Sequence, residues 1–303
     1  MFDVVIVGGG PAGLAAAIYL ARQKLSFVLL TGSVGGQTLL SSDVENYLGF
    51  HLLNGVELVS KFREHLDAYR DAFALKEGEE VMRIEKMHGG FRVKSYKEDY
   101  ETKTVLIATG TRHRALDVPG EKQLYGHGVT YCATCDAPLF RGKSVFVIGG
   151  GNSAMDAALF LSKYAGSITL VTTNAELKGD SVMREKIRSD SRIRVLPSTK
   201  TTGILGKDRV VGISVIGPDK KERTENAEGV FIEVGVEPSV AFIDFVRKDR
   251  SCQIVVDKAN ATNVEGIWAA GDVTDVAGKQ IAIAVGEGAK AALSIIRYLQ
   301  IHP

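Results

Sequence analysis

The sequence predicts an α/β fold made of two Rossmann-like, doubly wound dinucleotide-binding domains of the ββα type, with the second inserted in the first. Three observations lead to this prediction. The chain opens with a short apolar strand, a glycine turn and an alanine-rich helix within residues 3–22. The same arrangement returns at residues 144–164, and segments that contain Pro and Gly flank this second copy. A strand, glycine turn and helix begin a dinucleotide-binding fold, and an inserted domain needs two short crossings.

In the first copy, residues 3–7 form an apolar, β-branched run that suits a buried parallel strand. Glycines and a proline follow at residues 8–13, and the helical stretch extends from Leu14 to Arg22. A second strand at residues 26–30 closes a unit of about 30 residues, the size of a βαβ beginning.

The second copy repeats this order with a strand at residues 144–148 and glycines at 149–151. A helix is expected over residues 152–164 and a second strand over 167–171. The repeat is far longer than that of a solenoid, so it indicates a duplicated domain.

After each copy, at residues 79–108 and 201–234, the sequence alternates between apolar and polar residues in short stretches. This pattern predicts two segments of antiparallel strands. A strand and glycine turn at residues 266–273 precede a closing helix from Gln280 to Leu299.

The two crossings between domains are expected at residues 110–121 and 235–239, because both contain Pro and Gly. The first domain then comprises residues 1–114 and 242–303, and the second comprises residues 115–241.

The composition excludes several classes of protein. Lys and Arg number 37 against 36 Asp and Glu among 303 residues, so no charge excess points to nucleic acid or an anionic membrane. Three cysteines cannot form the disulfide framework of a secreted domain. The apolar start lacks a basic region and contains Asp3, which argues against a signal peptide or anchor. A cytoplasmic location follows as the default, with no membrane partner.

The glycine turns are the candidate nucleotide sites. In Gly8, Gly10 and Gly13, the first glycine allows the turn, the second lets the backbone approach a pyrophosphate, and the third permits close helix packing. Gly149, Gly151 and Ala154 give the variant with alanine last. A plain glycine turn is the alternative, but the flanking strands favour dinucleotide binding. Two such units suggest a flavin in one and a nicotinamide in the other.

The cysteines Cys132 and Cys135 form a Cys-x-x-Cys pair with three possible roles. Zinc needs four ligands, but only Cys252 remains and the six histidines show no metal spacing. A structural disulfide that closes a loop of only two intervening residues would constrain little of the unfolded chain. A dithiol–disulfide couple is therefore the favoured interpretation.

The motifs GGGPAG, GGQT, VENYLG, IATGT, YCATCD and GGGNSAMDAA, with AAGDV and KQIA, occur in this order from residue 3 to about residue 299. In this respect the chain resembles low-molecular-weight thioredoxin reductases. It is also similar to the C-terminal reductase part of the flavoprotein component of alkyl hydroperoxide reductase, notably in YCATCDAPLFRGK. That relative normally begins with an additional thioredoxin-like region, and the expectation here is a chain without one.

The resemblance implies that the first domain binds FAD. Its second strand ends in Thr31-Gly32 instead of the usual acidic residue, but this ending, followed by Gly35-Gly36-Gln37, is the pattern of the family that the chain resembles. Asp272 would then bind the ribityl chain; a simple turn cap is the alternative. The expected FAD residues are Gly8, Gly10, Pro11, Ala12, Gly13, Thr31, Gly32, Gly35, Gly36, Gln37, Asn46, Thr109, Gly110, Gly271, Asp272, Lys279, Gln280 and Ile281.

The second domain is expected to bind the nicotinamide donor. Relatives that use NADPH have two arginines where this chain has Thr173 and Asn174, and Thr172 stands where users of NADH often have a carboxylate. NADH is favoured over NADPH, and ferredoxin or another donor stays open. The expected contacts are Gly149, Gly151, Asn152, Ser153, Ala154, Thr172, Thr173, Asn174 and Lys178.

The resemblance also implies roles for the cysteine pair. Cys135 would lie nearest the flavin, Cys132 would attack the substrate disulfide, and Asp136 would protonate the departing thiolate, unless it only forms a turn. The expected function is a thioredoxin reductase-like enzyme, a homodimer that reduces a thioredoxin- or glutaredoxin-like protein. The alternatives are the reductase of a peroxide-removing system and a flavoprotein with a binding or sensing role.

Overall fold

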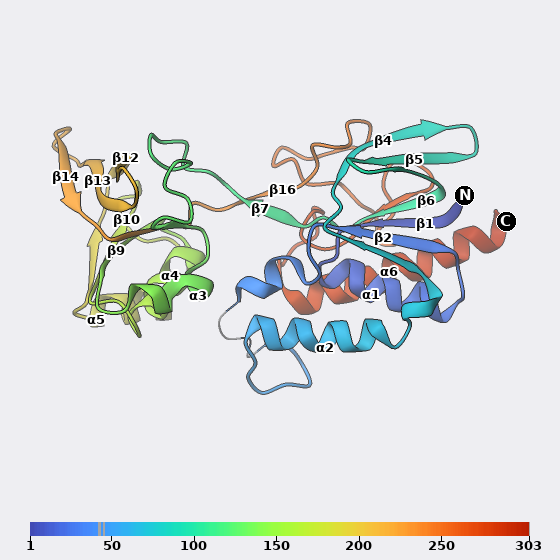
Figure 1. The fold of residues 1–303 in the computed structure, drawn as a ribbon, viewed down its shortest axis with the longest axis horizontal. Coiled ribbons are helices and arrows are strands. Elements are labelled where there is room, and N and C mark those ends of the chain that lie inside the picture. Colours follow the sequence, from blue (N-terminus) through green and yellow to red (C-terminus); the bar gives the residue numbers. More distant parts are fainter. Residues whose placement is uncertain (42–43, 45, 303) are drawn as a thin grey trace. The chain divides into compact units, whose positions relative to one another are not determined.

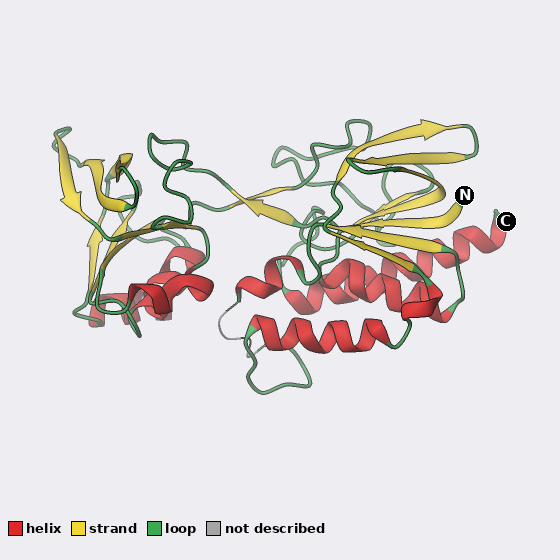
Figure 2. Cartoon of the chain, in the orientation of Figure 1, coloured by secondary structure: helices red, strands yellow, loops and turns green. Residues whose placement is uncertain are grey.

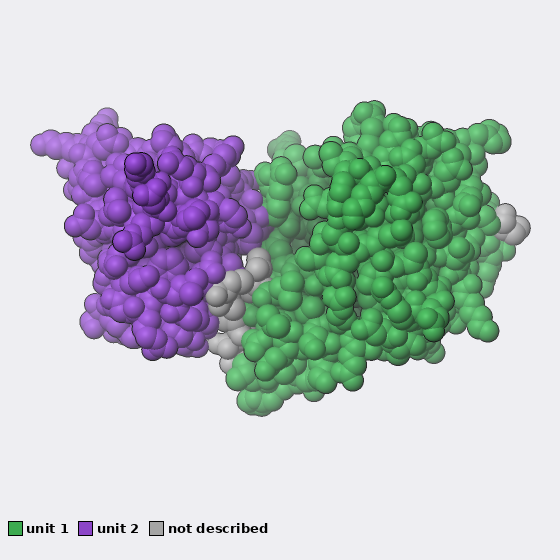
Figure 3. Space-filling model, viewed as in Figure 1, with its two compact units in different colours: residues 1–112, 237–303 green, residues 113–236 purple. Residues whose placement is uncertain are grey.

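The computed structural model describes residues 1–41, 44 and 46–302, without the side chains of Leu40, Thr134 and Cys135. The chain divides into two compact units, one of residues 1–112 and 237–303, the other of residues 113–236 (Figure 3). Unit 1 and unit 2 are described separately below.

Unit 1 is built on a seven-stranded sheet. Six strands follow the order β3-β2-β1-β6-β5-β4, and the seventh, β17, pairs with the last residues of β6. The strands β1, β2, β3, β6 and β17 pair in parallel, and β4, β5 and β6 pair antiparallel. The strands are β1 (Phe2–Val7), β2 (Phe27–Thr31), β3 (Ala74–Glu77), β4 (Val81–Met87), β5 (Gly90–Ser95), β6 (Asp99–Ile107) and β17 (Ile267–Ala269).

The helices of unit 1 lie together on one side of this sheet (Figure 1). They are α1 (Pro11–Arg22), α2 (Gly55–Asp67) and α6 (Ile281–Ile301), with short 3-10 helices at Gly36–Leu40 and Arg70–Ala72. Their apolar faces meet one face of the sheet in one core cluster, and the segment around residues 240–273 contributes to a second cluster on the opposite face. Because both faces are covered, β1 is apolar along its whole buried length, as the sequence predicted.

The strand β6 corrects the expectation that residues 79–108 are only a segment of antiparallel strands. Its residues 99–102 alternate between exposed and buried and pair antiparallel with β5. Its second half, Val105–Ile107, is continuously buried and pairs in parallel with β1 and β17. A change from alternating to continuous apolar residues therefore marks where this strand enters the covered sheet.

Helices α1 and α6 pack closely because small residues face each other at their crossing. A Cβ built on Gly288 would lie only 2.0 Å from the carbonyl oxygen of Ala12. The crossing places the first turn of α6 near the glycine turn that begins α1.

Among the described residues, no helix has the length and hydropathy needed to cross a membrane.

Unit 2 contains a five-stranded parallel sheet with the order β11-β10-β9-β15-β8 and a separate antiparallel sheet of β12, β13 and β14 (Figure 2). The parallel strands are β8 (Val129–Thr130), β9 (Ser144–Ile148), β10 (Ser167–Val171), β11 (Ile193–Leu196) and β15 (Gly229–Ile232). The antiparallel strands are β12 (Lys200–Gly206), β13 (Val210–Ile216) and β14 (Glu222–Asn226). The helices are α3 (Ala133–Asp136), α4 (Asn152–Leu161) and α5 (Ser181–Ser189), with a 3-10 helix at Ala137–Phe140.

Unit 2 confirms the predicted second Rossmann-like copy and corrects two details. Strand β15 was expected in the second segment of antiparallel strands, but it is fully buried and pairs in parallel with β9 and β8. Helix α4 ends at Leu161 instead of residue 164, because the chain then turns toward β10. The α/β fold with two such units is thus observed.

The two segments that join the units are β7 (Thr111–His113) and β16 (Val236–Pro238), which pair with each other. Both lie inside the expected crossings, but the units change at 112/113 and 236/237 instead of 114/115 and 241/242. The second shift arises because residues 239–243 belong to unit 1, where Ser239 donates to the carbonyl oxygen of Gly110.

Candidate functional site

The first glycine turn joins β1 to α1, and each glycine meets a different steric demand. Gly8 has a φ of +110°, and a Cβ there would lie 2.3 Å from the carbonyl oxygen of Ala108. A Cβ on Gly13 would lie 1.9 Å from the carbonyl oxygen of Gly8. By contrast, a Cβ on Gly10 would meet no atom within 4 Å. Gly8 and Gly13 therefore allow the turn to form, whereas Gly10 opens on free space that fits a pyrophosphate.

The second glycine turn, between β9 and α4, has the same geometry. Gly149 has a φ of +152°, and a Cβ there would lie 2.2 Å from the carbonyl oxygen of Glu233 and 2.8 Å from the Cβ of Ala154. A Cβ on Gly151 would meet no atom within 4 Å. The turn thus has the same tight first position and open second position as the turn of unit 1.

The helices that follow both turns present free N–H groups. Gly10 caps α1 and Gly151 caps α4, and neither glycine has a side chain that could accept a hydrogen bond from the first N–H groups of its helix. Pro11 and Ala12 begin α1, while Asn152 and Ser153 begin α4. A helix start with unpaired N–H groups and positive partial charge suits a phosphate, so both ends fit a dinucleotide.

A threonine at the end of the second strand packs against the middle glycine of each turn. The Thr31 hydroxyl accepts the N–H of Gly9 at 3.0 Å, and Thr172 is 3% exposed with its hydroxyl against Gly150. The position expected to hold a charged ribose contact therefore has a buried hydroxyl in both units.

Beside Thr172, the nicotinamide candidates form a neutral patch with one basic neighbour. Asn174 donates to the Thr172 hydroxyl through its backbone N–H at 3.2 Å, and Thr173 is exposed. The N–H of Lys178 donates to the carbonyl oxygen of Gly150 at 2.7 Å. Asn152 accepts the N–H of Asp180 at 2.8 Å. The loop after β10 is thereby fixed over the start of α4.

Four further hydrogen bonds fix other FAD candidates in unit 1. Gly35 donates its N–H to the carbonyl oxygen of Gly9 at 2.7 Å, which brings Gly36 against the first turn. The Asn46 amide donates to Gln280 at 3.0 Å, just before Ile281 begins α6. The remaining contacts involve Gln37 with the hydroxyl of Thr111 at 2.6 Å, and Thr109 with the carbonyl oxygen of Ser239 at 2.8 Å.

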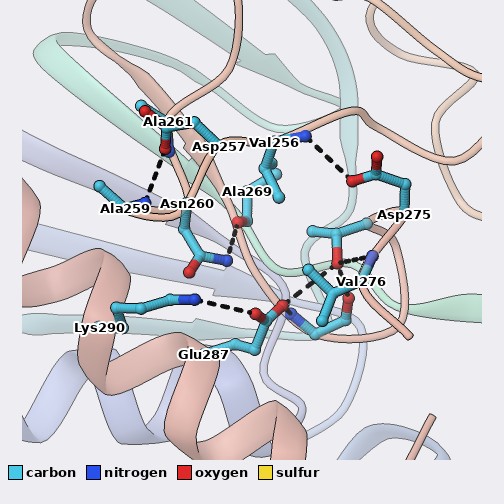
Figure 4. Close-up of polar contacts among 12 residues, drawn as sticks. Val256, Asp257, Ala259, Asn260, Ala261, Ala269, Asp275, Val276, Glu287 and Lys290 are labelled. Atoms are coloured by element: carbon cyan, nitrogen blue, oxygen red, sulfur yellow. Dashed lines mark hydrogen bonds and ion pairs between the residues drawn. The ribbon is translucent and has the colours of Figure 1, made fainter. Parts of the chain in front are cut away.

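A buried carboxylate of α6 supports the turn that contains Gly271 and Asp272. Glu287 is 5% exposed and accepts the N–H of Gly271 at 3.3 Å. The Thr274 hydroxyl lies 3.2 Å from the same carboxylate, and Lys290 donates to its other oxygen at 3.4 Å (Figure 4). Figure 4 also shows Asn260 donating to the carbonyl oxygen of Ala269, at 2.9 Å, on the strand before this turn. The turn that contains Asp272 is therefore held by Glu287 of α6, while Asn260 holds the end of β17 that leads into it.

Two titratable candidates near this turn have shifted pKa values. Burial raises the pKa of Asp272, the Lys279 ammonium opposes this effect, and the Glu287 carboxylate adds to it. Burial lowers the pKa of Lys279, which donates to the carbonyl oxygen of Thr274, although nearby carboxylates oppose the shift. Both charges are held in a partly desolvated turn, which is a common property of ligand sites.

The cysteine motif lies at α3 of unit 2. Cys132 is disulfide-bonded, whereas Cys252 is free and exposed; the side chain of Cys135 lies outside the described residues. Asp136 donates its N–H to the carbonyl oxygen of Cys132 at 3.2 Å. The N–H of Cys132 donates to the hydroxyl of Thr130 at 3.0 Å. A short helix therefore holds the two cysteines and Asp136 in one turn.

Unit 2 also contains a buried carboxylate that the sequence did not indicate, close to the cysteine motif. Glu121 is 1% exposed and accepts the N–H groups of Leu116 and Asp117 and the hydroxyl of Tyr131. Burial acts to raise the pKa of Glu121, but these hydrogen bonds outweigh it and lower that pKa. The Tyr131 ring also stacks on His113, so the residue before Cys132 is fixed from two sides.

Glu287 was also missed, although the sequence contained a signal for it. Glu287 lies three residues after Ala284 and four before Ala291, on the apolar face of α6. A charged residue on such a face has to find a buried partner. By contrast, nothing local distinguishes Glu121 from other loop glutamates.

Comparisons with known proteins extend this picture. The family model for pyridine nucleotide-disulphide oxidoreductases matches residues 2–288. The F subunit of the Staphylococcus aureus alkyl hydroperoxide reductase is 40% identical over 301 residues, which are 98% of this chain and 59% of that protein. The chain thus spans about three fifths of the length of this relative.

Two solved structures resemble nearly the whole chain. The thioredoxin reductase of Lactococcus lactis is 32% identical with a TM-score of 0.91, over 99% of this chain and 100% of the other. The thioredoxin reductase of T. acidophilum is 39% identical with a TM-score of 0.88, over 99% of each chain.

Proposed function

Because this chain belongs to the pyridine nucleotide-disulphide oxidoreductase family, we propose that it is an FAD-dependent protein-disulfide reductase. It is a thioredoxin reductase-like flavoprotein oxidoreductase by its relatives. Electrons would come from NADH and leave through Cys132 and Cys135 to a thioredoxin- or glutaredoxin-like protein. The observation that supports this most is the shared geometry of the two glycine turns, in one chain with a disulfide-bonded Cys132.

The residues of unit 1 fit the adenine dinucleotide part of FAD. The open space at Gly10 and the free N-terminus of α1 would hold its pyrophosphate, and Asp272 would bind its ribityl hydroxyls. When bound, FAD exchanges electron pairs between a nicotinamide and a disulfide. Unit 2 would hold the nicotinamide donor at the equivalent place, with Gly151 open and α4 uncapped.

The reduced cysteine pair would act by thiol–disulfide exchange. The Cys132 thiolate attacks one sulfur of the substrate disulfide, which forms a mixed disulfide and releases one substrate thiolate. Asp136, one turn from Cys132, would give that thiolate a proton. The Cys135 thiolate then attacks Cys132, which releases the second substrate thiolate and leaves the pair oxidised.

The end of β10 supports NADH as the donor. A 2′-phosphate is gripped best by paired arginines, but the exposed residue here is Thr173, and Asn174 turns to the Thr172 hydroxyl. The neutral amide and hydroxyl groups suit a ribose diol, and Lys178 is the one nearby cation among the candidates. NADPH and ferredoxin are the donors against which this proposal is tested.

A second candidate function is the reductase of a peroxide-removing system. The observation that favours it is the 40% identity to the F subunit of alkyl hydroperoxide reductase. In this alternative the same cysteine pair would reduce a dithiol carrier that serves a peroxiredoxin. A homodimer and a cytoplasmic location stay predictions for both functions.

The test is an anaerobic titration of the purified yellow protein with NADH and NADPH in parallel. We expect NADH to bleach the flavin, and thioredoxin added afterwards to be reduced by it. Bleaching by reduced ferredoxin but by neither nicotinamide would contradict the proposed donor. Reduction of a peroxiredoxin-linked carrier but of neither thioredoxin nor glutaredoxin would favour the second function, and a protein that takes up no FAD would contradict both.

A further inference from the structure

The end of β2 lacks the carboxylate that usually holds a ribose in this fold. Thr31 is 6% exposed, and its hydroxyl accepts the N–H of Gly9 and donates to the carbonyl oxygen of Ser33 at 2.8 Å. Gly32 comes next and has no side chain. A carboxylate at this place has to come from another segment.

The segment after β3 is fixed beside this strand end by its backbone. Strand β3 pairs in parallel with β2, and Glu77 lies opposite Thr31. The N–H of Glu79 donates to the carbonyl oxygen of Thr31 at 3.0 Å, and that of Gly78 donates to Gly32 at 3.2 Å. Residues 78–80 therefore keep a set position against the end of β2.

Two of the three glutamates in this segment already have protein partners. Glu77 pairs with Arg63 at 2.8 Å. Glu79 is 2% exposed, and its carboxylate lies 2.8 Å from the hydroxyl of Tyr100. Both serve contacts within unit 1, so neither is available to a ligand.

The third glutamate, Glu80, differs from these two. It is exposed, and its carboxylate has no hydrogen bond or ion pair with any residue that the structure describes. Its Oε1 lies 3.0 Å from the place of a Cβ on Gly32. The missing side chain of Gly32 thus leaves room for an unpaired carboxylate at the end of β2.

We propose that Glu80 binds the hydroxyls of the adenosine ribose of the FAD in unit 1, an inference that rests on the proposed function. The Gly9–Thr31 hydrogen bond places the end of β2 against the turn whose helix suits the pyrophosphate. In a dinucleotide the ribose follows the pyrophosphate toward the adenine. An ionised carboxylate accepts two hydroxyl groups, so Glu80 supplies from the segment after β3 what β2 lacks.

The experiment measures FAD binding to the full-length apoprotein by quenching of flavin fluorescence. We expect Glu80→Gln to weaken FAD binding about tenfold, which corresponds to about 1.4 kcal/mol. An FAD analogue whose adenosine lacks both ribose hydroxyls should bind the wild type with a similar loss. The Glu80→Gln variant should discriminate little between FAD and this analogue, because the two changes remove the same contacts.

Two further variants sharpen this test. Glu101→Gln, which removes an exposed carboxylate paired with Arg92, is the matched control and should bind FAD as the wild type does. In Gly32→Ala the new methyl group would displace the Glu80 carboxylate, so FAD binding should weaken. The double variant Gly32→Ala with Glu80→Gln should bind FAD no more weakly than Glu80→Gln alone.

The outcomes separate this inference from the function on which it rests. A Glu80→Gln variant that binds FAD with wild-type affinity, or that discriminates against the analogue as strongly as the wild type, overturns the role of Glu80 alone. A wild-type protein that takes up no FAD overturns the proposed function together with it.

Discussion

Glu287 of α6 accepts a hydrogen bond from the backbone N–H of Gly271, so a buried carboxylate holds the turn that contains Asp272. In Glu287→Ala this N–H would stay buried without its acceptor, and the Thr274 hydroxyl would keep only the carbonyl oxygen of Gly271, at 2.8 Å. We expect the free energy of unfolding to fall by about 2–3 kcal/mol, measured by urea denaturation followed through the single tryptophan, Trp268, in unit 1.

The control for this prediction is Glu287→Gln, which keeps an acceptor oxygen and the size of the side chain. It should lose less than half of the stability that the alanine variant loses. Equal losses in the two variants would show that the charge and its Lys290 partner matter more than the two hydrogen bonds.

The open glycines allow the two cofactor assignments to be tested separately. Gly10 and Gly151 have extended backbones that any residue adopts, and a Cβ on either meets no protein atom. We expect Gly10→Ala to fold normally but to weaken FAD binding at least about tenfold, because the methyl group enters the space for the pyrophosphate. Gly151→Ala should weaken NADH binding by a similar factor and leave FAD bound.

Calorimetric titration of both variants with both cofactors checks this assignment. Gly149→Ala is the contrasting variant, because its methyl group would meet the carbonyl oxygen of Glu233, and it should unfold at lower temperature. Loss of FAD in Gly151→Ala, or of NADH in Gly10→Ala, would reverse the assignment of the two units.

The cysteine pair should carry the whole protein-disulfide activity. We expect Cys132→Ser and Cys135→Ser each to lower thioredoxin reduction on the order of a thousandfold or more, since the nucleophile or its resolving thiol is lost. Cys252→Ser is the matched control, because that thiol is free and exposed, and it should keep wild-type turnover. Turnover is measured as NADH consumption with oxidised thioredoxin; a fully active Cys132→Ser enzyme would exclude the proposed route.

Glu233 predicts a dependence on pH in unit 2. Burial, and then the charge of Asp156, raise the pKa of Glu233 from 4.5 to about 8. The folded protein therefore keeps a proton that the unfolded chain releases, so this contribution to stability is complete below pH 4.5 and is lost as the pH rises through 8. Glu233→Gln should be more stable than the wild type at pH 9, by about 2 kcal/mol after allowance for partial exposure.

Urea denaturation at pH 5 and pH 9 checks this prediction, with the exposed Glu185→Gln as control. The stability gain of Glu233→Gln should appear at pH 9 and vanish at pH 5. A gain of the same size at both values would show that Glu233 does not titrate in this range.

The end of β10 predicts how the donor preference can be changed. In the double variant Thr173→Arg with Asn174→Arg, two guanidinium groups would stand beside the buried Thr172. We expect the ratio of kcat/KM for NADPH to that for NADH to rise at least about tenfold, through new pairs with the 2′-phosphate. Steady-state kinetics with both nicotinamides measures this ratio; an unchanged ratio would place the ribose elsewhere.

The sequence predicted what depends on local pattern. The strand–turn–helix copies were found because their pattern is local: Gly13 packs against Gly8, and Ala154 packs against Gly149, within six residues of chain. The mixed pairing of β6 was not found, because it depends on which strands lie on either side.

The missed site residues depend on the folded backbone. Glu80 reaches Gly32 only after β3 has paired with β2, and Glu121 reaches Leu116 and Tyr131 only once the irregular segment between them has folded back on itself. Their spacing in the sequence resembles no motif, so only the folded backbone distinguishes Glu80 from its neighbours Glu77 and Glu79.

The pairing of β7 with β16 has a consequence for how this protein can be rearranged. Arg114 donates its N–H to the carbonyl oxygen of Gly235 at 2.9 Å, so the two ends of residues 113–236 leave unit 2 side by side. Paired strands are about 5 Å apart, a gap that a few residues bridge. Residues 113–236 can therefore be transferred as one continuous segment. The segment could be inserted into a surface loop of another protein, or replaced by the homologous segment of a relative that has a different donor preference.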